Sequence, residues 1–134
     1  MMLTTRLTGT VTTDDVQRWK ESLVRDAASV PDGGTFRLLL DLRGYEPANT
    51  DAHKAMRVVI PLFLADYGFR TALLDLFPGT ELPLRNLRGI TCTAFANVHH
   101  DPTKMSEYER KLARANERFF TDVDEARAWL EGLA

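Results

Sequence analysis

Two kinds of apolar pattern alternate along the chain and predict its secondary structure. Short segments that alternate with period two, or that are apolar throughout, are typical of strands, whereas apolar residues spaced by three or four are typical of helices. Strands are predicted at residues 3–11, 36–42, 71–77, 90–98 and 118–121. Helices are predicted at residues 13–28, 51–67, 102–115 and 122–133. This order favours an α/β fold with a mostly parallel sheet of about five strands and four helices.

The connection between the third and fourth predicted strands differs from the others. Residues 78–89 contain proline and glycine and show no helical pattern, so no crossover helix is predicted there. Strand 71–77 could therefore pair with strand 90–98 as an antiparallel edge strand. No repeat or linker-like stretch divides the chain, and we expect a single domain over residues 1–134.

The predicted helix 51–67 is more apolar than a helix on one sheet face needs to be. Such a helix requires an apolar stripe of only about 100°, whereas residues 58–64 are apolar around most of the circumference. Pro61 should kink this helix or break it. Either other parts of the chain cover the helix, or it contacts a partner or a small apolar ligand, and we expect a homodimer through residues 51–67. The expected contact residues are Arg43, Met56, Val59, Ile60, Phe63 and Tyr67.

Composition excludes several functional classes. The 134 residues carry 17 Lys+Arg against 19 Asp+Glu, a net charge of −2, which gives no basic field for nucleic acid. The longest apolar run, residues 58–65, is too short for stable membrane insertion. The lone Cys92 falls on an apolar strand face, and the three histidines lack metal-ligand spacing, so no metal or cofactor is expected. The first residues contain no apolar signal core, and we expect a cytoplasmic protein.

Polar residues gather near the predicted ends of two strands, and they raise the alternative of a small α/β enzyme. Ligands bind beyond the carboxyl ends of parallel strands, where His99, His100 and Asp41 would be the candidate catalytic residues beside Arg43. Because neighbouring strand residues point to opposite faces, only one of the two histidines would face a given site. Asp75 and Asp101 could join this cluster, although Asp101 before Pro102 also suits a helix N-cap.

Three segments resemble the SpoIIAA-like subgroup of STAS domains, which is related to the anti-anti-sigma regulators and grouped with the CRAL-TRIO lipid-binding domains. They read LTGTV at residues 7–11, LLLDLRGY at residues 38–45 and FFTDVDEARAWL at residues 119–130. All three are core strands and helix starts, and none is a catalytic motif. The resemblance therefore implies a STAS-like fold and a non-catalytic module that binds a protein partner or a small apolar ligand.

The resemblance also implies a third possibility, a phosphorylation-regulated anti-anti-sigma-type regulator. In phosphorylatable STAS regulators, a strand ending in Asp-Leu-Ser precedes a loop Asp-Ser-Ser-Gly, one serine of which receives phosphate. Here Arg43 replaces the first serine, and residues 49–52 read NTDA in place of the tetrapeptide. Asp51 stands where the modified serine is expected, so Thr50 is the candidate phosphorylation site. Thr50 can alternatively be read as a helix N-cap.

Overall fold

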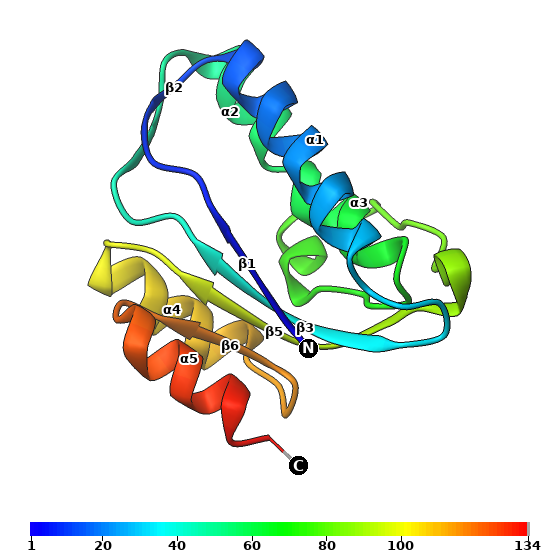
Figure 1. The fold of residues 1–134 in the computed structure, drawn as a ribbon. Coiled ribbons are helices and arrows are strands. Elements are labelled where there is room, and N and C mark those ends of the chain that lie inside the picture. Colours follow the sequence, from blue (N-terminus) through cyan, green and yellow to red (C-terminus); the bar gives the residue numbers. More distant parts are fainter. Residues whose placement is uncertain (134) are drawn as a thin grey trace.

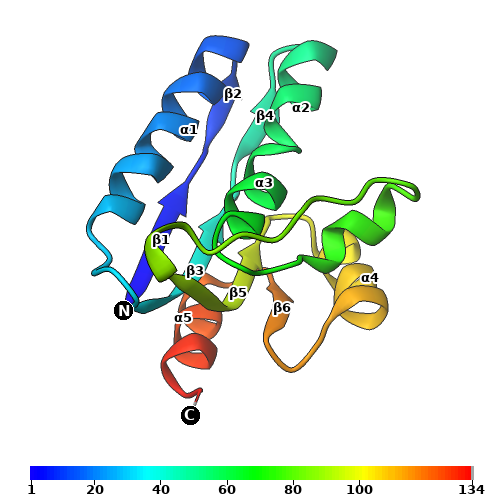
Figure 2. The same cartoon turned by 90° about the vertical axis from the view of Figure 1, so that its right-hand side faces the viewer.

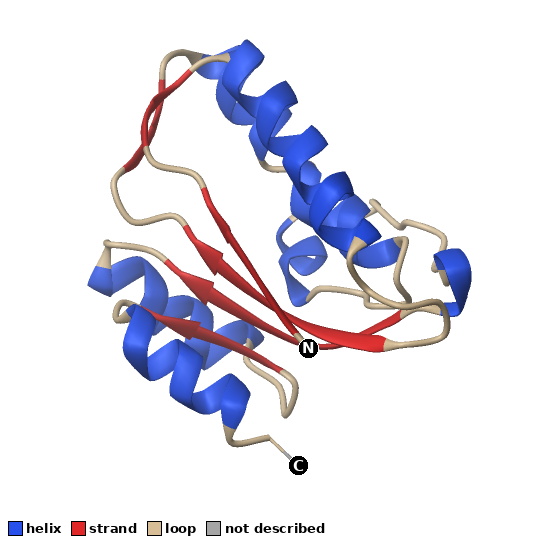
Figure 3. Cartoon of the chain, viewed as in Figure 1, coloured by secondary structure: helices blue, strands red, loops and turns tan. Residues whose placement is uncertain are grey.

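Four parallel strands form the central sheet of the computed structural model, which describes residues 1–133 (Figure 1). The strands are β1 (Met2–Arg6), β3 (Thr35–Asp41), β5 (Thr91–Val98) and β6 (Glu117–Phe120), in the order β1-β3-β5-β6. β2 (Gly9–Val11) and β4 (Tyr45–Pro47) form a separate parallel pair beyond the carboxyl ends of β1 and β3 (Figure 3). The predicted strand 3–11 is therefore divided, and its second part leaves the main sheet.

Helices cover both faces of this sheet (Figure 1). α1 (Thr13–Ala28), α2 (Thr50–Met56) and α3 (Val59–Ala65) lie on one face, and α5 (Val123–Glu131) lies on the other. α4 (Pro102–Leu112) packs along the edge strand β6. This double cover explains why Leu38, Leu39 and Leu40 of β3 are all buried. Among residues 1–133, each helix is too short or too polar to span a lipid bilayer.

Polar side chains cap the starts of α1, α4 and α5, and Asp101 does so as the sequence predicts. Thr12 and Asp15 form a reciprocal capping box at α1. Asp101 accepts a hydrogen bond from the Lys104 amide at the start of α4, and Pro102 occupies the first turn. Asp122 caps α5 in the same way. The first residues of these helices are therefore determined by hydrogen bonds between neighbours in the sequence.

The segment predicted as a strand at residues 71–77 is instead a short 3-10 helix, η1 (Ala72–Leu76). The Thr71 hydroxyl accepts a hydrogen bond from the Leu73 amide, and the Glu117 carboxylate accepts one from the Ala72 amide at 2.9 Å. These amides are thereby bonded in a turn rather than to a neighbouring strand. The predicted antiparallel pairing of residues 71–77 with residues 90–98 is therefore wrong. Every strand pair within the described residues is parallel. A second 3-10 turn, η2 (Leu87–Gly89), precedes β5.

The predicted helix 51–67 breaks into α2 and α3. Pro61 has no amide hydrogen, and its ring would clash with the carbonyl of Arg57 four residues earlier, so the helix is interrupted at residues 57–58. Val59, Ile60 and Leu64 are buried in the main core, whereas Val58 and Leu62 are 48% and 44% exposed. Most apolar side chains of residues 58–64 are therefore covered by other parts of the same chain.

Candidate functional site

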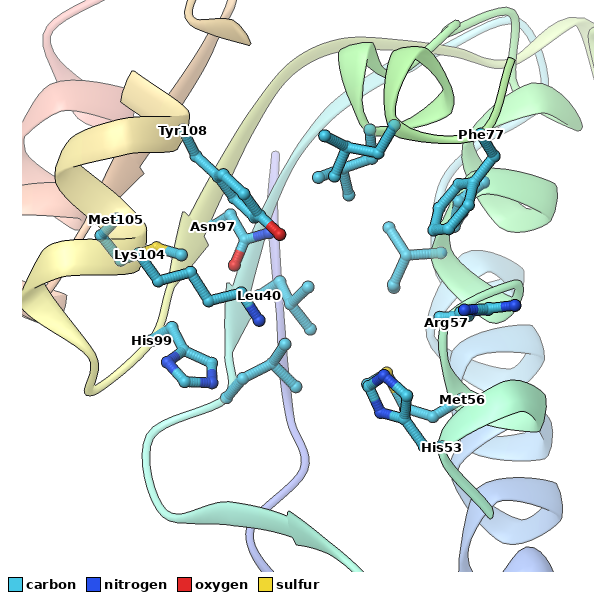
Figure 4. A pocket seen from close by; sticks show the side chains of 15 residues that line it. Leu40, His53, Met56, Arg57, Phe77, Asn97, His99, Lys104, Met105 and Tyr108 are labelled. Atoms are coloured by element: carbon cyan, nitrogen blue, oxygen red, sulfur yellow. The ribbon is translucent and has the colours of Figure 1, made fainter. Parts of the chain in front are cut away.

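A cavity opens near the carboxyl end of the central sheet, between α4 and the α2–α3 pair (Figure 4). Its volume is about 140 Å³, close to the roughly 150 Å³ of an apolar cavity that holds benzene. Nine apolar side chains line it: Leu40, Leu42, Met56, Ile60, Pro61, Leu73, Leu76, Phe77 and Met105. Six polar or amphipathic side chains complete the lining: His53, Arg57, Asn97, His99, Lys104 and Tyr108. The cavity thus has the mixed lining of a small-molecule site.

The walls of the cavity come from segments that are far apart in the sequence. β3 and β5 supply the floor with Leu40 and Asn97, and η1 lies beside α4 (Figure 2). Met105 and Tyr108 lie three residues apart on α4, so both fall on the helix face directed at the cavity. The parallel arrangement of β3 and β5 therefore places the cavity where ligands bind in open α/β sheets.

Asn97 is the most unusual polar residue of the cavity. Its side chain is only 5% exposed, and its Oδ1 accepts no hydrogen bond from any of residues 1–133. A buried polar atom without a partner costs about 1–3 kcal/mol, so it usually has a reason to be there. Asn97 is also one of the residues that line the cavity, so a molecule that enters the cavity lies against its side chain. A lone asparagine in the apolar strand sequence CTAFANV is the signal that could have identified it.

His99 lines the cavity as a neutral hydrogen-bond donor. Its Nδ1 accepts a hydrogen bond from the Asp101 amide at 3.0 Å, which leaves the proton of the neutral ring on Nε2. Burial, followed by the nearby charges of Lys104 and His100, lowers the pKa of His99 to about 4. At neutral pH the ring is therefore uncharged and suited to bind rather than to accept a proton from solvent.

The other members of the predicted polar cluster are engaged elsewhere. His100 accepts a hydrogen bond from the Gly44 amide at 3.0 Å. Arg43 binds the Asp41 carboxylate with two guanidinium contacts of 3.0 and 2.9 Å. Burial raises the pKa of Asp41, but the hydrogen bonds from Arg43 outweigh burial and leave this pKa lowered. Among residues 1–133, no hydrogen bond joins either histidine of the cluster to Asp41.

Of the two remaining aspartates, Asp75 lies apart, whereas Asp101 contacts His99 through its backbone amide. Asp75 pairs with Arg70 at 3.0 Å on the exposed side of η1, and Asp101 caps α4. The structure therefore keeps the two histidines together, with their rings stacked at 4.2 Å, although only His99 lines the cavity.

Cys92 is buried in the main core and is not among the residues that line the cavity. Burial raises the pKa of its thiol to about 12, so the thiolate is scarce at neutral pH. Within residues 1–133, no group of three or more His, Cys, Asp or Glu side chains could hold a metal ion.

Four of the six residues expected at a partner surface are buried within the chain instead. Val59, Ile60, Phe63 and Tyr67 are at most 9% exposed, and the Phe63 ring packs on the Tyr67 ring at 5.2 Å. These four side chains belong to the core because α3 faces the sheet. Met56 and Ile60 line the cavity, while Arg43 is held by Asp41.

Thr50 is exposed at the first position of α2. The N-cap is one residue earlier, since the Asn49 side chain accepts a hydrogen bond from the Ala52 amide at 2.8 Å. This corrects the interpretation of Thr50 as the cap and leaves its hydroxyl without a capping role.

Comparison with known proteins agrees with this architecture. The family model described as SpoIIAA-like matches residues 2–131 of the 134. No curated protein and no solved structure matches the chain. The matched range includes all the strands and helices described above as well as the cavity between them. The chain therefore belongs to the SpoIIAA-like family of STAS domains.

Proposed function

We propose that this protein is a non-catalytic module that binds a small, mainly apolar molecule in the cavity between α4 and the α2–α3 pair. The observation that carries the proposal is the unpartnered Oδ1 of Asn97 at the floor of a largely apolar cavity. Membership of the SpoIIAA-like family supports a non-catalytic or regulatory role at a coarse level, since STAS domains generally mediate interactions.

Binding is favoured over catalysis by the way the polar groups are used. A general acid or base must itself lie within hydrogen-bond reach of the reacting atoms. The Asp41 carboxylate instead accepts two hydrogen bonds from the Arg43 guanidinium. Two of the polar side chains that line the cavity, Asn97 and His99, are neutral donors or acceptors. Such groups orient a ligand without changing it.

Benzyl alcohol is a suitable first probe, because its ring matches the cavity volume and its hydroxyl can donate to Asn97. We expect backbone amide NMR signals of residues 97–108 and 53–60 to shift on titration, and Met56→Trp to abolish these shifts by filling the cavity. Leu84→Trp is the control, since Leu84 is 53% exposed and lies outside the cavity lining. Shifts that are absent, or that persist in Met56→Trp, would contradict the proposal.

A homodimer is a second proposal. The surface proposed for it is now a groove beside α3 rather than the whole of residues 51–67. Three exposed apolar side chains, Val24, Val58 and Leu62, line a shallow groove between α1 and α3. Exposed apolar patches of this kind are typical of protein contacts. We infer that a second copy of the chain would use this groove rather than the buried side of α3.

Leu62→Asp is expected to shift a dimer to monomers, because it places a charge at the centre of the groove while leaving the core unchanged. Light scattering at increasing protein concentration measures this shift, with Leu84→Asp as the matched control. A wild type that stays monomeric at high concentration would rule the dimer out.

A further inference from the structure

Cations without acidic partners flank the cavity. Of the fifteen residues that line it, Arg57 and Lys104 carry full positive charges and none is an aspartate or glutamate. Within residues 1–133, neither side chain forms an ion pair with a carboxylate. The cavity is therefore a positive site in a chain whose net charge is −2.

Both cations are held against aromatic rings at the cavity wall. The Arg57 guanidinium lies 4.9 Å from the centre of the Phe77 ring, and the Lys104 ammonium lies 5.6 Å from the centre of the Tyr108 ring. Contacts of this kind keep a cation in place without neutralising its charge. The two cations thus remain available to an anion.

Figure 4 shows how the polar groups are arranged around the cavity. Lys104 extends from α4 on one wall, and Arg57 lies at the end of α2 on the opposite wall. Asn97 lies between them on β5, at the floor. Arg57 is exposed whereas Asn97 is buried, so the charges are at the open side and the unpartnered amide oxygen is at the closed side.

The positions of the two cations and of the Asn97 amide define which chemical groups a ligand needs. An anion that contacts these cations gains charge-assisted hydrogen bonds, and the cavity accommodates an apolar body of about six heavy atoms. The buried acceptor on Asn97 requires a donor from the ligand, which a hydroxyl group provides. His99 offers one further donor through Nε2.

We propose that the cavity binds a small aromatic or branched carboxylate that carries a hydroxyl group, with the carboxylate between Arg57 and Lys104 and the hydroxyl donating to Asn97. This inference rests on the proposed function and adds the charge and the polar groups of the ligand to it. The cavity volume excludes a long acyl chain as the enclosed part of the ligand.

The test compares two probes of the same shape, 4-hydroxybenzoate and its neutral isostere 4-hydroxybenzamide, by isothermal titration calorimetry. We expect the carboxylate to bind the wild type at least about tenfold more tightly than the amide, because its hydrogen bonds are charge-assisted. Lys104→Met and Arg57→Met should each reduce this preference, and the double variant should remove it. Lys20→Met is the control, because it removes the same charge from the exposed side of α1.

Each outcome distinguishes the inference from the function on which it rests. Equal binding of the two probes, or a preference that survives in the double variant, would overturn the charge assignment while leaving the binding module in place. If neither of these probes nor benzyl alcohol binds, the inference and the proposed ligand-binding function are both overturned. Circular dichroism of each variant verifies that the fold is retained, as expected for substitutions of side chains that lie at the cavity opening.

Discussion

Replacing Glu117 by alanine is expected to destabilise the protein by about 3–5 kcal/mol, the usual cost of removing one partner from a buried polar network. Glu117 is completely buried at the start of β6. Its carboxylate accepts hydrogen bonds from the Thr71 hydroxyl at 2.7 Å, the Ala72 amide at 2.9 Å and the Arg114 guanidinium at 2.9 Å. Because Thr71 and Ala72 are buried as well, the substitution leaves their donors without partners and without water.

The measurement is urea unfolding of Glu117→Ala beside Glu107→Ala. Glu107 also forms an ion pair, with Lys111 at 2.7 Å, but both side chains are half exposed. An exposed pair of this kind contributes at most about 1 kcal/mol, so the control should unfold close to the wild type. Equal losses for the two variants would mean that the Glu117 network does not fix η1.

The same substitution should also affect the cavity. η1 supplies Leu73 and Leu76 to the cavity lining, and Glu117 fixes the residues at its start. The structural role of Glu117 is thus linked to the proposed binding site, and benzyl alcohol binding should weaken in Glu117→Ala even at temperatures where the variant remains folded.

Glu117 also shows why part of the fold could not be predicted from the sequence. Residues 71–77 have the composition of a strand, but a carboxylate 46 residues later in the chain binds the Thr71 hydroxyl and favours a turn. By contrast, the strand at Leu38–Leu40 and the helix starts at Asp101 and Asp122 depend on neighbouring residues. Local patterns predict such elements, whereas tertiary contacts override them elsewhere.

The site could be predicted only in part, and the reason lies in β5. Alternation over residues 90–98 predicts that Cys92 and Ala94 share a face, but the register with β3 shifts so that Thr93 is an extra residue. An irregularity of this kind reverses which side chains face each way. Asn97 consequently lies on the same side as Cys92 and faces the cavity. His99 was a candidate from its place at the strand end. Asn97 was marked only as a lone asparagine in an apolar strand, and nothing local distinguished Lys104 as a cavity residue.

The proposed binding function requires that Asn97 serves a ligand rather than the fold. Asn97→Leu replaces the unpartnered amide by an apolar side chain that suits a buried strand. We expect the ligand-free variant to be more stable than the wild type by about 1–2 kcal/mol, because a buried acceptor without a donor is removed. The same variant should bind benzyl alcohol about tenfold more weakly, since the hydroxyl of the probe then enters the cavity unpaired.

Urea unfolding of Asn97→Leu, combined with benzyl alcohol titration of the same sample, therefore distinguishes a ligand-binding role of Asn97 from a structural one. We expect higher stability together with weaker binding. Lower stability with unchanged binding would contradict the proposed binding function, because the amide would then serve the fold and the cavity would have no polar group set aside for a ligand.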